Sequence, residues 1–119
     1  MSNVKESLES LIELSGAKCA ALVDSDSGMV IGQAGTSPNM DVAAAGNTEV
    51  VRAQLKLNAA LGLKDSIDDI LITLTSQYDI VRPLTSNPSI FLYLTMDKSK
   101  SNLALARFKV EECEAQLVL

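Results

Sequence analysis

The sequence contains no histidine and no tryptophan, and aromatic residues make up only 3% of its 119 residues. Without histidine the chain lacks the commonest general base and the commonest metal ligand. It has no G-x-x-x-x-G-K-[ST] phosphate loop, and none of its serines lies in a G-x-S-x-G motif. We therefore expect a protein that is not an enzyme, with no catalytic residue and no cofactor.

Long apolar runs are also missing. The longest runs span about five residues, whereas a helix that crosses a membrane needs ~20. The first residues carry no basic flank that leads into an apolar stretch, so no secretory signal is visible. The sequence predicts a cytoplasmic protein without direct membrane insertion.

Basic charge is scarce, because the net charge is -5. Between Asp24 and Asp79, eight acidic residues face three basic ones. Nucleic-acid binding needs the opposite sign, so nucleic acid is not an expected partner. With 47% apolar residues, the chain fits one compact domain that spans residues 1–119.

The two cysteines, Cys19 and Cys113, are far apart and have no C-x-x-C spacing, which argues against a zinc site and a redox pair. We expect both to be reduced, although a disulfide between them stays open. The turn at residues 24–28 begins like a calcium loop, with acids at Asp24 and Asp26. Its twelfth position is Gly35 instead of a bidentate Glu, so no metal site is expected.

Hydrophobic periodicity predicts the first half of the fold. Helical spacing indicates a first helix that Asn3 caps, with Glu6 in the reciprocal position, and that Gly16 ends. A strand at 19–23, a polar turn and a second strand at 29–32 follow. A long helix is then predicted from Asp41 to Leu61, closed by Gly62. The apolar face of the first helix comprises Val4, Leu8, Leu11 and Ile12.

Three strands and a helix complete the chain. Apolar runs at 70–74, 78–84 and 90–96 are separated by polar turns, and the first of them extends in our prediction over 67–75. The run at 90–96 is apolar on both faces, so this strand belongs at the centre of the sheet. A helix with an apolar stripe from Leu103 to Leu117 follows. The predicted order is α-β-β-α-β-β-β-α.

The long helix carries a wider apolar band than a single packing face needs, which indicates contact with more than one surface. Plain core packing remains the alternative. One face of the band comprises Val50, Gln54, Leu57 and Leu61, and the adjacent face Ala44, Val51, Leu55 and Asn58.

Three short motifs carry a resemblance to a known family. They are Leu22-Val23-Asp24 running through Gly28 into Val30-Ile31, the strand end at residues 81–84, and the helix start Asn102 to Arg107. In these motifs, and in the order of its elements, nearly the whole chain resembles the Roadblock/dynein light chain family, although Ala104 stands where that family commonly has Gly. The resemblance implies an α+β fold of three layers, α/β/α. A five-stranded antiparallel sheet would carry the long helix on one face and two helices on the other, as in profilin-like domains.

The resemblance also implies a function. Bacterial single-domain members are similar to regulators of small Ras-like GTPases, and two copies join through the edge strand after the long helix and through the long helices. We expect a non-catalytic homodimeric adaptor that binds such a GTPase and modulates its nucleotide cycle. A scaffold subunit without GTPase contact and a small-ligand sensor remain alternatives. The expected dimer interface comprises Ile67, Ile70, Ile72, Thr73, Leu74, Val50, Gln54 and Leu57, and the expected partner site comprises Glu49, Arg52 and Lys56.

Overall fold

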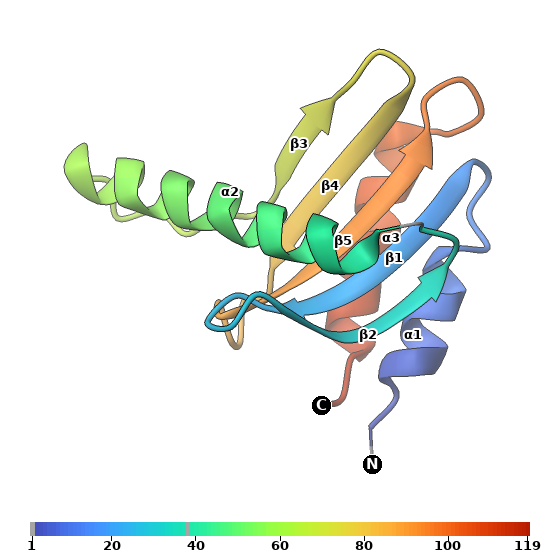
Figure 1. The fold of residues 1–119 in the computed structure, drawn as a ribbon, viewed down its shortest axis with the longest axis horizontal. Coiled ribbons are helices and arrows are strands. Elements are labelled where there is room, and N and C mark those ends of the chain that lie inside the picture. The colour runs from blue at the N-terminus through green and yellow to red at the C-terminus, as the bar shows by residue number, and fades with distance from the viewer. Residues whose placement is uncertain (1, 38) are drawn as a thin grey trace.

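The computed structural model describes residues 2–37 and 39–119, and its elements follow the predicted order (Figure 1). The predicted boundaries of the helices are correct to within a few residues. The elements are α1 (Val4–Leu11), β1 (Ala17–Asp24), β2 (Met29–Gly35), α2 (Met40–Ala60), β3 (Ile70–Thr73), β4 (Gln77–Pro83), β5 (Ile90–Asp97) and α3 (Leu103–Gln116).

The five strands form one antiparallel sheet in the order β2-β1-β5-β4-β3. The predicted central place of β5 is confirmed. Its apolar side chains alternate between the two faces and are buried on both, Phe91 and Tyr93 on one side and Leu92 and Leu94 on the other. A strand that is apolar on both faces is stable only where a helix layer covers each face.

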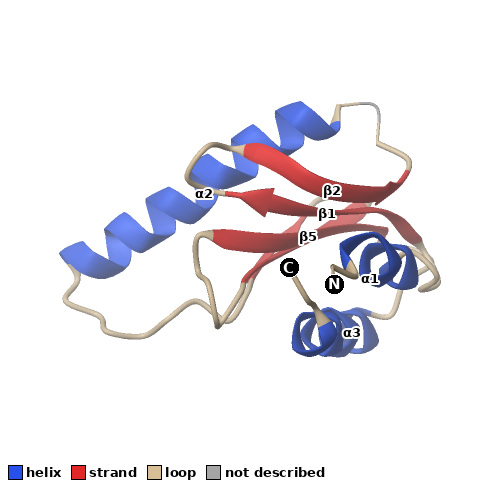
Figure 2. Cartoon of the chain, turned by 90° about the horizontal axis from the view of Figure 1, so that it is seen from below, coloured by secondary structure: helices blue, strands red, loops and turns tan. Residues whose placement is uncertain are grey.

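Helices cover the two faces unequally, as predicted. Figure 2 shows α2 along one face and α1 with α3 along the other. Each face of the sheet has its own buried cluster. Cys113 lies in the cluster between the sheet and the pair α1 and α3, and Cys19 lies in the cluster on the α2 side. Both cysteines are free. The sheet separates them, so the disulfide that the sequence left open is excluded.

The two halves of α2 differ in burial. Its buried residues, Met40, Ala44, Thr48 and Val51, all lie in the first twelve positions of the helix. From Arg52 to the end of the helix no residue is buried. In Figure 1 this second half projects past β3, beyond the sheet that supports the first half.

The strand predicted over 67–75 is shorter than expected, since β3 covers only Ile70–Thr73. Side chains hold the residues before it. The carbonyl oxygen of Asp68 accepts a hydrogen bond from Arg82 at 3.3 Å, and the Asp69 carboxylate accepts two from Arg107, each at 3.0 Å. Inclusion of Ile67 in the strand was therefore wrong.

Asn3 stands at the N-cap of α1 as predicted, but the side-chain cap expected from it was wrong. The Asn3 side chain makes no cap hydrogen bond. It donates to the carbonyl of Gln116 and accepts from the amide of Val118, each at 2.7 Å, so it ties the two ends of the chain together. The predicted left-handed backbone at Gly16 is confirmed by its φ of +84°, but Gly16 does not end the helix, because α1 already ends at Leu11. A Cβ there would lie 3.0 Å from backbone atoms of the segment before α3.

Candidate interaction surface

One edge of the sheet, β3, has a strand partner on one side only, namely β4. Leu74 donates its N–H to the carbonyl of Gln77 at 2.8 Å. Because hydrogen-bonded and non-hydrogen-bonded pairs alternate along an antiparallel ladder, the N–H groups of Leu71 and Thr73 point away from β4. The edge therefore presents unpaired donors, which is a template for another strand.

The half of α2 that projects past this edge is apolar (Figure 1). Leucine side chains there keep about half of their surface exposed: Leu55 46%, Leu57 50% and Leu61 64%. Val50, just before this half, is 36% exposed. Contiguous exposed apolar residues of this kind mark interaction sites in soluble proteins. We call Val50, Leu55, Leu57, Leu61 and strand β3 together the α2–β3 surface.

An apolar groove lies between the helix and the sheet. It has a volume of about 200 Å³ and separates the projecting half of α2 from the end of β4. Its walls are apolar apart from one serine, so it suits a hydrocarbon side chain rather than a polar ligand. The lining residues are Leu55, Ser66, Ile67, Pro83, Leu84 and Pro88.

The structure places the residues predicted for the dimer interface in two groups. The first lies along the edge strand and its flanks: Ile67, Ile70, Ile72, Thr73 and Leu74. The second lies on α2: Val50, Gln54 and Leu57. Gln54 donates a hydrogen bond to Asn58 at 2.8 Å, so its amide already has one partner within the helix.

The residues predicted for the partner site do not form one free charged rim. Arg52 reaches from α2 to the β1–β2 turn, where its Nη2 donates to the carbonyl oxygens of Ser25 at 2.8 Å and Asp26 at 3.0 Å. Its Nη1 lies 3.4 Å from Glu49 Oε1. Lys56 makes no ion pair among the described residues. Of the three, Lys56 offers the charge that a partner could meet without breaking an internal contact.

Sequence reasoning missed a polar row on the α2 face of the sheet. The register places Ile72 opposite Asp79, Asp79 opposite Thr95, and Thr95 opposite Cys19. Burial raises the pKa of Asp79, although Gln77 donates to its carboxylate at 2.9 Å. The Thr95 hydroxyl is buried without a partner among the described residues. The alternation of β4, in which Asp79 shares a face with the buried Val81, was the signal that could have found this row.

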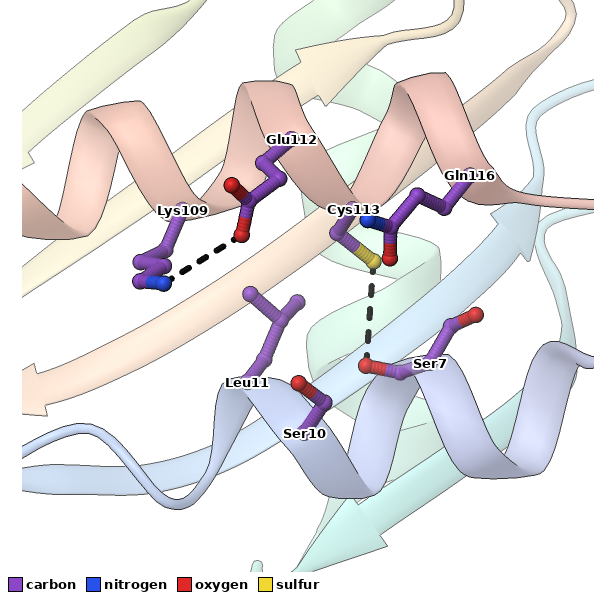
Figure 3. Close-up of a pocket in the computed structure, with 7 residues that line it drawn as sticks. All are labelled: Ser7, Ser10, Leu11, Lys109, Glu112, Cys113 and Gln116. Carbon is purple, nitrogen blue, oxygen red and sulfur yellow. Dashed lines mark hydrogen bonds and ion pairs between the residues drawn. The ribbon is translucent and has the colours of Figure 1, made fainter.

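On the opposite face, α1 and α3 enclose a small polar crevice (Figure 3). Its volume is about 30 Å³, room for a water molecule but not for a metabolite. The Cys113 thiol donates to the carbonyl of Ser7 at 3.7 Å, and burial raises the pKa of this thiol to about 11. The crevice therefore gives no support to a small-ligand sensor.

In the part of the chain that the structure describes, no helix is long and apolar enough to span a membrane. The same residues include no group of three or more acidic or cysteine side chains placed to hold a metal ion.

Solved structures resemble this fold over most of the chain. MglB from Myxococcus xanthus matches with a TM-score of 0.82 and 19% identity, covering 94% of this chain and 89% of that one. A Roadblock/LC7 domain from Streptomyces avermitilis matches with a TM-score of 0.83 and 16% identity, covering 96% and 93%. The gliding protein MglB from Thermus thermophilus matches with a TM-score of 0.77 and 20% identity, covering 92% and 81%.

The sequence itself matches no protein-family model and no curated protein. The likeness is therefore structural, and at these identities it concerns the fold. The sheet order, the helix layers and the similar structures confirm the resemblance that the motifs predicted. The chain has the fold of a Roadblock/LC7 domain.

Proposed function

We propose that this protein is a non-catalytic homodimeric adaptor that binds a small Ras-like GTPase and modulates its nucleotide cycle. The observation that carries the proposal is the α2–β3 surface. This surface combines the outer side of β3, which pairs with no strand of the described residues, with the apolar half of α2 that projects beyond the sheet. A monomer would leave both the edge donors and the leucines in water.

A second copy satisfies both features at once. A two-fold axis that pairs β3 with its counterpart gives the N–H groups of Leu71 and Thr73 acceptors on the other chain. It also brings the projecting half of each α2 towards the other copy. Complete burial of a leucine side chain is worth about 1.5–3 kcal/mol, so Leu55, Leu57 and Leu61 can contribute substantially. A similar solved structure is described as MglB with a tetrameric arrangement, which supports self-association of this fold.

The GTPase is proposed from the Roadblock resemblance. The sequence has no histidine and no phosphate loop, so it brings no nucleotide chemistry of its own. A GTPase carries its own nucleotide and magnesium sites, and an adaptor can act on it by reorganising its switch loops. On α2 we assign the first contact to Lys56. Glu49 and Arg52 belong to the proposed site through their position, although Arg52 would give up its bonds to the turn if it were recruited.

The test is binding to purified small Ras-like GTPases of the source organism, each loaded with GDP or with a non-hydrolysable GTP analogue. Biolayer interferometry should detect one that binds with a preference for one nucleotide state. Lys56→Glu should weaken that binding severalfold, chiefly through slower association. Lys64→Glu, which reverses an exposed lysine beyond the end of α2, is the matched control and should leave it unchanged.

The outcome also separates the alternatives. Binding that is equal for GDP and the GTP analogue would indicate an adaptor that does not sense the nucleotide, whereas a protein that dimerises but binds no GTPase would favour the scaffold subunit without GTPase contact. Absence of binding to every GTPase tested would overturn the regulatory proposal and leave the dimer to be judged separately.

A further inference from the structure

The outward side of α3 carries a second apolar feature, away from the α2–β3 surface. The chain has two phenylalanines, and while Phe91 is fully buried at the centre of the sheet, Phe108 is 57% exposed. Leu105, one turn earlier on the helix, is 45% exposed. The exposed alanines Ala104 and Ala115 flank them along the same side. Small neighbours leave the helix surface open to close approach by another helix.

A hollow of about 400 Å³ adjoins this stripe. It separates α3 from the segment that enters β3, so it lies on the opposite face of the sheet from α2 (Figure 2). Its lining combines one large aromatic side chain with several charged ones. The lining residues are Asp68, Asp69, Arg82, Ala104, Arg107, Phe108 and Glu111.

The charges around the hollow do not cancel. Arg107 donates two hydrogen bonds to Asp69, and Arg82 pairs with Glu114 at 2.5 Å, so both arginines are occupied within the chain. The carboxylates of Asp68 and Glu111 make no ion pair among residues 2–37 and 39–119. The surplus is negative and lies next to Phe108. We call Leu105, Phe108, Asp68 and Glu111 the α3 patch.

We propose that the α3 patch docks a basic amphipathic helix of a partner protein. Apolar side chains of that helix would pack on Phe108 and Leu105, and its lysines or arginines would pair with Asp68 and Glu111. The negative surplus disfavours nucleic acid and anionic membranes. It also disfavours a second copy of this chain, whose net charge is -5. Since α2 lies on the other face, the patch does not rest on the proposed function and can be filled while the α2–β3 surface is occupied.

The test uses two synthetic probes and the full chain. One probe is an 18-residue helix with leucines on one face and lysines on the other, and the second has every lysine replaced by glutamate. Amide chemical shifts should map the lysine peptide to Leu105, Phe108 and Glu111. Its affinity should fall with added salt, because paired exposed charges are screened. The glutamate peptide should bind at least about tenfold more weakly, or about 1.4 kcal/mol.

Variants make the assignment specific. Phe108→Ala should weaken the lysine peptide at least about tenfold, while Val42→Ala, a truncation at a 69% exposed site on α2, should leave it unchanged. Asp68→Lys with Glu111→Lys should reverse the preference, so that the glutamate peptide binds more tightly. Circular dichroism confirms that each variant is folded.

Two results of the peptide experiments would overturn the proposal, and a third concerns self-association. One is equal binding of the two peptides to the wild type, and the other is chemical-shift changes confined to α2 and β3. Self-association that Phe108→Ala abolishes would likewise overturn it, by identifying a second copy as the occupant.

Discussion

The two halves of α2 belong to one continuous helix, yet only the first half is part of the core. Ala44 and Val51 are 0% and 1% exposed because β1 and β2 lie beneath them, whereas Leu57 is 50% exposed because the sheet has ended. The second half nevertheless carries leucines at positions 55 and 57. The apolar stripe of a helix therefore indicates how much surface must be covered. It does not indicate whether the same chain or another molecule covers it.

The two edges of the sheet repeat the contrast. At the β2 edge, a Cβ added to Gly32 would lie 2.8 Å from the Val4 side chain, so α1 packs directly against that strand. The pairing of β1 with β2 is also interrupted between Leu22 and Val23, and irregularities of this kind discourage edge-to-edge pairing. The register of β3 with β4 is unbroken. The β2 edge is therefore protected against pairing with another strand, whereas the β3 edge is open to it.

A substitution that stops the open edge from pairing should have the largest effect on the protein. Thr73→Pro removes an N–H that points away from β4, so the internal ladder keeps its hydrogen bonds while the edge loses a donor. We expect the dissociation constant of the dimer to rise at least about a hundredfold, or about 2.7 kcal/mol. Light scattering over a concentration series measures it. Thr73→Ala, which keeps the N–H, is the control, and a Thr73→Pro protein that dimerises like the wild type would refute the edge pairing.

The next effect separates the two halves of α2. Val51→Ala should lower the free energy of unfolding by about 1–2 kcal/mol, because it leaves a cavity in a filled core. Leu57→Ala should change the stability of the monomer by less than about 0.5 kcal/mol and act instead on the dimer. Urea unfolding in the Thr73→Pro background isolates the contribution of the monomer. Equal losses from both substitutions in that background would show that the two halves are not different.

A smaller effect concerns Asp79, which lies in the polar row opposite Ile72 of the open edge. Burial raises its pKa above the ordinary value of 3.8, so the native state holds this proton more tightly than the unfolded chain does. The stability that this group contributes is present below pH 3.8 and is lost as the pH rises through the native pKa.

Asp79→Asn imitates the protonated form and keeps an acceptor for Gln77. Thermal unfolding should therefore show the variant to be more stable than the wild type at neutral pH, with a difference that shrinks towards about pH 4. Asp26→Asn in the exposed β1–β2 turn is the control. A variant that is less stable at neutral pH would mean that a group we have not placed holds Asp79 ionised.

The two cysteines lie away from both open features, so their substitution should affect the dimer least. Cys19→Ala and Cys113→Ala should each cost on the order of 1 kcal/mol of stability and leave dimerisation intact. The raised pKa of Cys113 keeps its thiol protonated at neutral pH, so a thiol reagent should react slowly with the native protein. Loss of the dimer in a folded double variant would show that the cysteines contribute to the interface.

Much of the fold could be read from local patterns. The double-sided apolar alternation of Phe91 to Leu94 predicted the central strand, and Gly16 was correctly predicted to be left-handed, although the first helix ends earlier, at Leu11. The prediction of the side-chain cap failed because a segment distant in the sequence binds the polar side chain instead. Asn3 bonds to residues at the far end of the chain instead of capping α1, and no local rule anticipates that.

For the candidate site too, local patterns predicted some features and the tertiary structure was needed for others. The width of the apolar band on α2 indicated an extra contact, but the band alone could not show that only the half beyond Val51 is free. The three- and four-residue spacing of Glu49, Arg52 and Lys56 placed them on one side of the helix. It could not show that the carbonyls of Ser25 and Asp26 hold Arg52, because those residues precede it by 27 and 26 positions. The negative surplus of the α3 patch depends on the ion pairs that join α3 to Asp69 and to Arg82 of β4, which only the tertiary structure reveals.

Pairing of β3 with a second copy underlies the proposed dimer, and amide hydrogen exchange measures that pairing at the backbone itself. Ile72 and Leu74 donate towards β4, whereas Leu71 and Thr73 donate away from it, so the two sets report on different neighbours. We predict that raising the protein concentration through the dimerisation range slows exchange at Leu71 and Thr73. Exchange at Ile72 and Leu74 should already be slow in the monomer. Fast exchange at Leu71 and Thr73 at every concentration would contradict pairing through this edge.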